Sequence, residues 1–225
     1  MRLTIIILFA SSSLLAQTFT VEKVSGIVTY QENGNEKWGN LEEGFVLNDN
    51  AIISTSENST VQLGKQGLTF SLDEWSAISI SSIKTMSIDD LLLALAFEDM
   101  LNAPKDIKES SDHTAVYGTR EGETNSIQIR SEDFGIKRLN GAVRLAELGF
   151  QESAVVAAKE TFRKYPDTKP LPGYRLYFAN ILYDKGLYEE ALGEYKSISG
   201  LSITDYQKSE IEEKSEMIRK KLLND

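Results

Sequence analysis

Residues 174–197 read YRLYFANILYDKGLYEEALGEYKS, and this stretch decides the fold of the C-terminal part of the chain. Apolar side chains recur every three or four residues on both sides of Gly186, the pattern of two amphipathic helices. These side chains are Leu176, Ala179, Leu182, Tyr188, Ala191, Leu192 and Tyr195. Gly186 stands where a left-handed residue ends the first helix. We therefore expect an antiparallel helix pair that buries one stripe against the other.

Residues 138–164, RLNGAVRLAELGFQESAVVAAKETFRK, repeat this layout. Gly149 and Ala154 are spaced as Gly186 and Ala191 are, and the two copies lie 37 positions apart (191 minus 154). A period of about 34 residues is typical of helical repeats, and the connector that contains Pro166 accounts for the excess. These features resemble the tetratricopeptide repeat over residues 138–198. The resemblance implies stacked helical hairpins that bind other proteins.

In such a stack the first helix of each pair, here residues 139–148 and 174–185, is expected to line a groove. The candidate contact residues in that groove are Arg144, Tyr174, Tyr177 and Asn180. Residues 204–223 predict one more helix, because Thr204 and Gln207 form a capping box and the charges run from acidic to basic along it. We expect this helix to cap the end of the stack.

In the N-terminal part of the chain, apolar residues recur every second position, and not every 3.6 residues as in the helical part. Short apolar stretches follow one another from residue 19 to about residue 83, separated by Gly, Asn, Asp or Ser turns such as Asn33-Gly34. This pattern favours an antiparallel β-sandwich or a barrel-like fold, with Gly26 marking a bulge or a close backbone approach. The expected core residues are Val24, Val28, Leu47, Ile52, Val61, Leu63, Phe70 and Ile78.

Three motifs in this part are similar to the FecR-type periplasmic domain. They are V-x-G-x-V at residues 24–28 followed by Trp38, the series Leu41, Gly44, Leu47, Asp49, Ile52 and Thr55, and S-x-V-x-L at 59–63. The resemblance implies a small β domain in the bacterial envelope that binds rather than catalyses. Some relatives of this type are regulators of sigma factors, which leaves an extracytoplasmic signalling role as one alternative.

Residues 87–103, SIDDLLLALAFEDMLNA, predict a helix that Ser87 and Asp90 cap and Pro104 closes. Its apolar residues nearly surround the helix, so it requires cover on more than one side. One interpretation is a clamp between the β part and the helical repeats, with Leu92 and Leu95 at the contact. The other is an exposed helix that binds a partner. Residues 113–120 and 127–129 are expected to return to the sheet as strands.

The chain begins MRLTIIILFASSSLLAQ, which has the form of a secretory signal peptide cleaved after Ala16. The competing interpretation is a retained membrane anchor, but the apolar run falls short of the ~20 residues of a spanning helix. No span is expected after cleavage. There is no cysteine, and the net charge of −10 makes nucleic acid an unfavourable partner. We expect a periplasmic or secreted bacterial protein. Its predicted parts are a signal peptide (1–16), a FecR-like β domain (17–83), a linking helix and returning strand (84–134) and a helical domain resembling tetratricopeptide repeats (135–225).

An enzyme is not expected, because no nucleophile elbow, phosphate-binding loop or metal-ligand set is present in the sequence. His113 is the sole histidine, so no metal or other cofactor is predicted. The leading hypothesis is a non-catalytic envelope scaffold of α+β class that assembles with other envelope proteins. The alternative is a module that binds glycan or peptidoglycan through Trp38 or Trp75.

Overall fold

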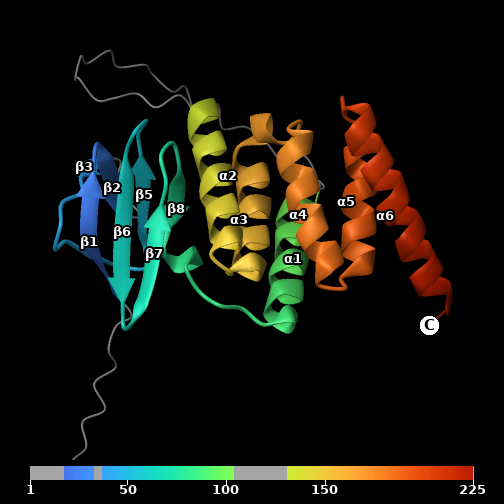
Figure 1. Cartoon of the computed structure of the whole chain (residues 1–225), viewed down its shortest axis with the longest axis horizontal. Helices are drawn as coiled ribbons and strands as arrows, with labels where there is room; N and C mark the ends of the chain where they lie inside the picture. The colour runs from blue at the N-terminus through green and yellow to red at the C-terminus, as the bar shows by residue number, and fades with distance from the viewer. Residues whose placement is uncertain (1–17, 33–36, 104–130, 225) are drawn as a thin grey trace, which may run out of the picture.

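The computed structural model describes residues 18–32, 37–103 and 131–224. These residues form two four-stranded antiparallel sheets and six α-helices, so the protein is of α+β class. The elements follow one another in a row, with the sheets at one end, α2 and α3 next to them, then α4 and α5, and α6 at the far end (Figure 1). The change from sheet to paired helices predicted near residue 135 is therefore present.

The two sheets pair strands that are distant in sequence. One sheet has the order β4-β1-β6-β7 and the other β3-β2-β5-β8. The strands are β1 (Phe19–Ser25), β2 (Val28–Glu32), β3 (Gly39–Asn40), β4 (Val46–Leu47), β5 (Ala51–Thr55), β6 (Thr60–Lys65), β7 (Leu68–Leu72) and β8 (Ala77–Ser79). The sheets stay separate, so the expected sandwich is confirmed and the barrel-like alternative is not.

Gly26 lies where the chain leaves the first sheet, at the end of β1, and enters the second at β2. Its φ of +77° is a left-handed conformation, and a Cβ added there would lie 2.4 Å from Oγ of Ser59. The same hydroxyl accepts the N–H of Ile27 at 2.8 Å. Both the conformation and the close approach require glycine, as the period-2 pattern predicted.

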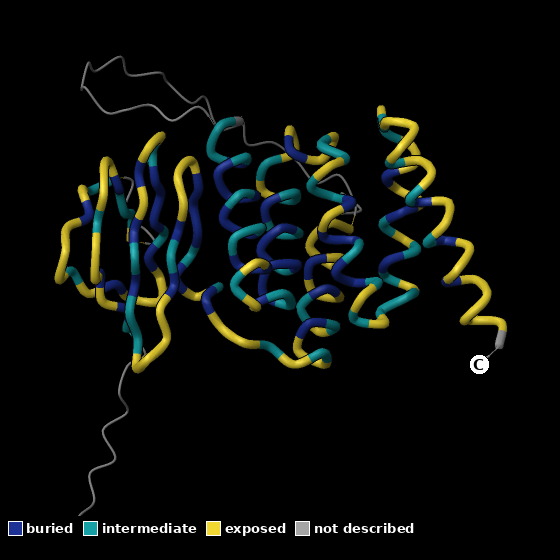
Figure 2. Tube along the Cα trace, in the orientation of Figure 1, coloured by how far each residue is buried: buried dark blue, intermediate teal, exposed yellow. Residues whose placement is uncertain are grey.

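The inner faces of the sheets carry the alternating apolar residues of the sequence. Val28, Leu47, Val61, Leu63, Phe70 and Ile78 are buried as expected. Val24 and Ile52 are only half-buried. Ile52 lies between the buried Ala51 and Ile53 of β5, so its side chain is on the opposite face of the strand from theirs. Figure 2 shows the alternation of buried and exposed residues along the strands.

The helices of the C-terminal part form two antiparallel hairpins. The helices are α2 (Ser131–Glu147), α3 (Gln151–Lys164), α4 (Pro172–Asp184), α5 (Tyr188–Ile198) and α6 (Asp205–Asn224). Gly149 joins α2 to α3 with φ +91°, and Gly186 joins α4 to α5 with φ +78°. Both glycines therefore adopt the left-handed conformation that ends a helix, as predicted.

The last helix closes the row of hairpins. The N–H of Thr204 donates to Oε1 of Gln207 at 3.0 Å, and the N–H of Gln207 donates to Oγ1 of Thr204 at 3.2 Å, so the predicted capping box is confirmed. Ile211 and Ile218 are buried toward α5, while most other positions of α6 are exposed (Figure 2). This distribution is that of a solvating terminal helix.

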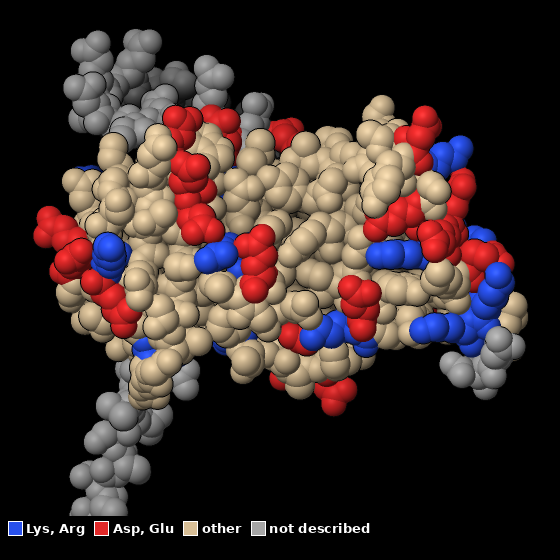
Figure 3. All heavy atoms as spheres, in the orientation of Figure 1, with Lys and Arg blue, Asp and Glu red and all other residues tan. Residues whose placement is uncertain are grey.

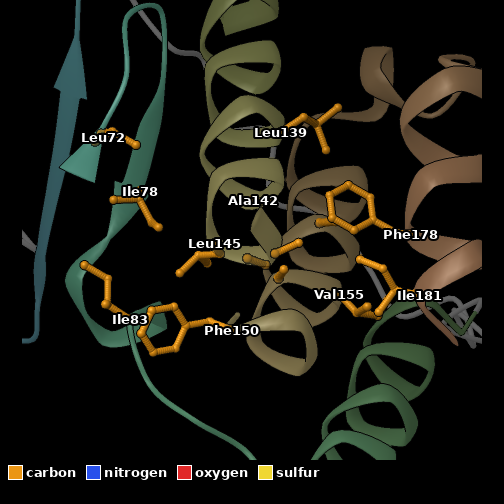
Figure 4. Close-up of a cluster of buried hydrophobic side chains, with 14 of the residues drawn as sticks. Leu72, Ile78, Ile83, Leu139, Ala142, Leu145, Phe150, Val155, Phe178 and Ile181 are labelled. Carbon is orange, nitrogen blue, oxygen red and sulfur yellow. The ribbon is translucent and has the colours of Figure 1, made fainter. Parts of the chain in front are cut away.

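The sandwich and the helices share one apolar core, and α2 is the element that joins them. Figure 4 shows Leu145 and Phe150 facing Ile78 and Ile83 on one side, while Leu139 and Ala142 lie toward the following hairpin. The clamp hypothesis placed residues 87–103 between the sandwich and the helical repeats. The helix does pack on α3, a helix of the repeats, but α2 and not this helix makes the main helical contact with the sandwich, through β8. Helix α2 also begins at Ser131, earlier than the residues 138–139 expected from the repeat.

Several predictions fall on residues that the structure does not describe. They are the signal peptide (1–16), the Asn33-Gly34 turn, and the returning strands at 113–120 and 127–129. Strands β2 and β3, which flank that turn, pair antiparallel with Thr29 opposite Asn40.

Candidate interaction surface

Helix α1 (Ile88–Asn102) departs most clearly from the pattern of an ordinary surface helix. Its N-terminus is set by a capping box, in which the N–H of Asp90 donates to Oγ of Ser87 at 3.1 Å. The carboxylate of Asp90 accepts from the Ser87 hydroxyl at 2.8 Å and from its N–H at 3.3 Å. These bonds lower the pKa of the Asp90 carboxyl, and they confirm the predicted start of the helix.

One face of α1 is buried against α3. Leu91, Leu95 and Glu98 lie on this face at spacings of four and three residues, and all three are buried. The guanidinium of Arg163 in α3 donates to both carboxylate oxygens of Glu98, at 2.6 and 3.2 Å. This bidentate pair raises the pKa of Arg163 and fixes the rotation of α1 about its axis.

The segment that leads into α1 is held to the same helix. Oγ of Ser153 in α3 donates to the carbonyl of Lys84 at 2.6 Å, and Ile83 is buried. The path from β8 to α1 is thus attached at both of its ends, through Ile83 near the sheets and through Leu91 on α3. These contacts fix the orientation of α1 relative to α3.

The opposite face of α1 is apolar and exposed. Leu93, Phe97, Met100 and Leu101 follow at i, i+4, i+7 and i+8, and their exposed fractions are 73%, 57%, 74% and 45%. Residues with this spacing lie along one side of a helix. We call these four residues the outer stripe of α1. Contiguous exposed apolar side chains of this size mark interaction sites on soluble proteins.

The residues predicted at the contact of this helix, Leu92 and Leu95, are not those of the outer stripe. Leu95 is buried on α3 and Leu92 is half-buried, so neither belongs to the outer stripe. The helix is apolar nearly all round, and its sequence alone does not tell which stripe a neighbour covers. Glu98 was the available signal, because a carboxylate within an apolar helix indicates the side on which a basic partner lies.

The proposed groove residues are largely engaged within the fold. Nε of Arg144 donates to the carbonyl of Ser71 in β7 at 3.0 Å, and the same nitrogen lies 3.2 Å from a carboxylate oxygen of Asp73. The hydroxyl of Tyr174 donates to Oδ1 of Asn140 at 2.6 Å, and burial raises its pKa. Arg144 therefore joins α2 to the sandwich instead of lining a groove.

Of the other two candidate groove residues, Asn180 is bonded within the fold and Tyr177 stays partly exposed. Asn180 accepts from the Tyr195 hydroxyl at 2.8 Å and donates to Glu210 at 2.8 Å, which links α4, α5 and α6. Tyr177 is 36% exposed, and its ring packs edge-on against Phe178 at 5.2 Å between centroids. Tyr177 is the one of the four candidates that keeps an accessible ring.

The two tryptophans also contact the helices. The ring of Trp38 is half-buried and packs edge-on against Phe134 of α2 at 5.5 Å. The ammonium of Lys137, itself 3% exposed, lies 4.4 Å from the centre of the Trp75 ring and donates to the carbonyl of Thr55 at 2.8 Å. Burial lowers the pKa of Lys137. Both rings thus contact side chains of α2 at the junction between sandwich and helices, and Trp75 keeps an exposed fraction of 36%.

A groove of about 650 Å³ lies between α5 and α6. Its lining mixes apolar Leu192 and Ile211 with side chains of both charges, and Arg219 pairs with Glu216 of the same helix at 3.8 Å. Because apolar, acidic and basic side chains all line this groove, its composition does not indicate which class of ligand it would bind. On the face shown in Figure 3, basic and acidic side chains are likewise interspersed, apart from blue side chains that gather near the C-terminal end of α6.

Among residues 18–32, 37–103 and 131–224, no cluster of His, Asp or Glu has the arrangement of a metal site. Within the same part of the chain, no helix has both the length and the apolar character that crossing a bilayer requires. Comparison of the chain with models of protein families, with curated proteins and with solved structures gives no match. The outer stripe of α1 is thus the site that the geometry itself singles out.

Proposed function

We propose that the protein is a non-catalytic interaction scaffold of the bacterial envelope, and that it binds another polypeptide through the outer stripe of α1. The observation that carries the proposal is the two-sided helix: one stripe is fixed on α3, and the other presents four large apolar side chains to solvent. The resemblances to FecR-type domains and tetratricopeptide repeats support a role in binding. The secretory form of residues 1–16 supports an envelope location.

The size of the stripe indicates how strongly it binds. Complete burial of a large apolar side chain contributes about 1.5–3 kcal/mol, so four partly exposed ones contribute on the order of 5 kcal/mol. A micromolar complex requires about 8 kcal/mol, and association also costs translational and rotational entropy. The stripe alone therefore supports only a weak contact. A specific partner must also engage the polar residues beside it.

A photo-crosslinking amino acid at position 97 tests this function in cells of the source bacterium. We expect cross-links from position 97 to another polypeptide, and none from the same amino acid at position 213, an exposed residue of α6. Cross-links confined to the chain's own residues would show that the stripe is covered from within. Equal cross-linking from both positions would also overturn the proposal.

The glycan alternative receives less support, because Trp38 contacts Phe134 and Lys137 occupies one face of the Trp75 ring, which leaves 36% of that side chain exposed. The two tryptophans are the only ones in the chain, so intrinsic fluorescence reports on both. If soluble peptidoglycan fragments shift or quench that fluorescence in a saturable manner, the glycan function replaces the one proposed here.

A further inference from the structure

We infer that the groove between α5 and α6 is the seat of one more amphipathic helix, which another polypeptide supplies and which carries a carboxylate for Lys196 and a base for Glu212. The composition of the groove does not by itself indicate a ligand, but its place in the helical repeat does. This site is separate from the outer stripe of α1. Two spaces between helices carry the inference, one of them filled and the other open.

The filled space lies where α5 packs against α3 and α4. Only about 10 Å³ stays empty there, between residues of all three helices. Glu194 of α5 accepts from the ammonium of Lys159 in α3 and from the guanidinium of Arg175 in α4. The hydroxyl of Ser197, one turn further along α5, accepts from the same guanidinium at 2.9 Å. The helix in this seat is therefore positioned by polar contacts with both walls as well as by packing.

The open space is the same place one repeat further along the chain. Helices α5 and α6 line it as α3 and α4 line the filled space, and the lining residues are displaced by 37 positions, the offset between Ala154 and Ala191. The groove measures about 650 Å³, and the described residues place no helix in it. The corresponding residues include Val155 and Leu192, Lys159 and Lys196, Arg175 and Glu212, and Phe178 and Ser215.

The floor of the groove suits a large apolar side chain. Ile211 and Leu192 supply apolar surface from its two walls. Ser215 stands where the filled seat has Phe178, and a serine leaves room for a side chain of the incoming helix. Helical repeats bury their apolar faces by stacking on neighbouring helices. An open seat of this kind therefore exposes surface that a further helix would cover.

Each wall of the groove carries one exposed charge that the fold does not use. Within the part of the chain that the structure describes, neither Lys196 nor Glu212 makes an ion pair. Lys196 corresponds to Lys159, which is paired with Glu194, whereas Glu212 stands in the place of a base, Arg175. An incoming helix thus meets a base on the α5 wall and an acid on the α6 wall. A carboxylate and a base one turn apart on that helix complement the two walls.

The test uses α5 itself as the probe, because α5 fills the equivalent seat. Residues 187–200 are synthesised as a stapled, fluorescent helix with Ser197→Lys, which brings Glu194 of the peptide to Lys196 and the added ammonium to Glu212. A second peptide has the reversed charges, Glu194→Lys with Ser197→Glu. Fluorescence anisotropy with the full chain measures both affinities. We expect the first peptide to bind about tenfold more tightly than the second.

A charge swap in the groove gives the matched variant. Lys196→Glu with Glu212→Lys should reverse the preference for the two peptides. Lys208→Glu with Glu213→Lys swaps two exposed charges of α6 that do not line the groove, and it should leave the preference unchanged.

Three results overturn the inference: equal binding of the two peptides, binding of neither, or a preference that the groove swap does not reverse. Sedimentation showing a dimer that Lys196→Glu dissociates would overturn it as well, because the groove would then belong to a second copy. None of these results bears on cross-links from position 97, so the proposed function is tested separately.

Discussion

The backbone of Gly141 in α2 lies directly against the carbonyl oxygen of Ala77 in β8. A Cβ added to Gly141 would be 2.1 Å from that oxygen and 2.9 Å from the carbonyl carbon. Strand β8 is the edge of its sheet, and β7 is the edge of the other. Helix α2 thus covers the side of the sandwich where both sheets end, at a distance that only glycine allows. Exposed sheet edges promote aggregation, and a covering helix is one way in which proteins protect them.

Gly141→Ala is expected to destabilise the protein by about 1–3 kcal/mol, because backbone cannot yield as a flexible side chain does. Gly193→Ala is the matched control: Gly193 lies in α5, and a Cβ there meets nothing within 4 Å. That change should stabilise the protein by up to ~1 kcal/mol, since alanine favours helix. Urea unfolding followed by circular dichroism measures both. Equal effects would contradict the close approach of α2 to β8.

Arg144 anchors the same junction from the next turn of α2. It donates to the carbonyl and the hydroxyl of Ser71 at 3.0 and 2.7 Å. Arg144→Met keeps the aliphatic stem and removes these charge-assisted bonds, so we expect a loss of about 2 kcal/mol in the free energy of unfolding. Arg219→Met, at a site 63% exposed, should change it by less than about 0.5 kcal/mol. Thermal melts of the two variants distinguish the outcomes, and indistinguishable melts would contradict the anchoring role.

The two faces of α1 predict opposite results for the same substitution. Leu95→Ala creates a cavity against α3 and should cost about 2–5 kcal/mol. Leu93→Ala removes a side chain that is 73% exposed and should change stability by less than about 0.5 kcal/mol. Chemical denaturation of the two variants gives the comparison. A large loss for Leu93→Ala would mean that the outer stripe is covered within the chain.

Local signals in the sequence predicted the structure well. The capping residues Ser87 and Thr204 and the left-handed Gly149 and Gly186 were all identified, because caps and helix ends depend on neighbours within a few residues. The short strands were identified for the same reason, through their alternation and turns. Their order in the sheets was not, since β1 pairs with β6 across most of the β part.

The candidate site depended on contacts between distant segments, which no local pattern contains. Arg144 fits a repeat groove by position, yet Ser71, more than seventy residues earlier, determines its use. Leu93 and Leu95 are both leucines of α1. Only the position of α3 makes Leu95 buried and leaves Leu93 exposed. The sequence pattern therefore indicates the helix that carries the proposed surface but not which face of that helix is exposed.

The helical hairpins are joined by a half-buried charge cluster with a defined pH dependence. Glu194 of α5 accepts from Lys159 of α3 and from Arg175 of α4, the latter at 2.9 Å. Burial acts to raise the pKa of the Glu194 carboxyl, but the two cations more than offset it, and the pKa lies below the ordinary value of 4.5. Because the folded-state pKa is lowered, the stabilisation is present above the unfolded value and is lost as pH falls through the folded one.

Glu194→Gln should therefore destabilise the protein by about 2 kcal/mol near neutral pH, since it leaves two half-buried cations facing each other without a carboxylate. The difference from the wild type should shrink as pH is lowered below 4.5, where the wild-type carboxyl becomes protonated as well. Glu213→Gln, on the exposed face of α6, should show neither the loss nor the pH dependence. Urea unfolding of the three proteins at a series of pH values measures this. A difference that stays constant from neutral to acidic pH would show that Glu194 acts through packing and not through its charge.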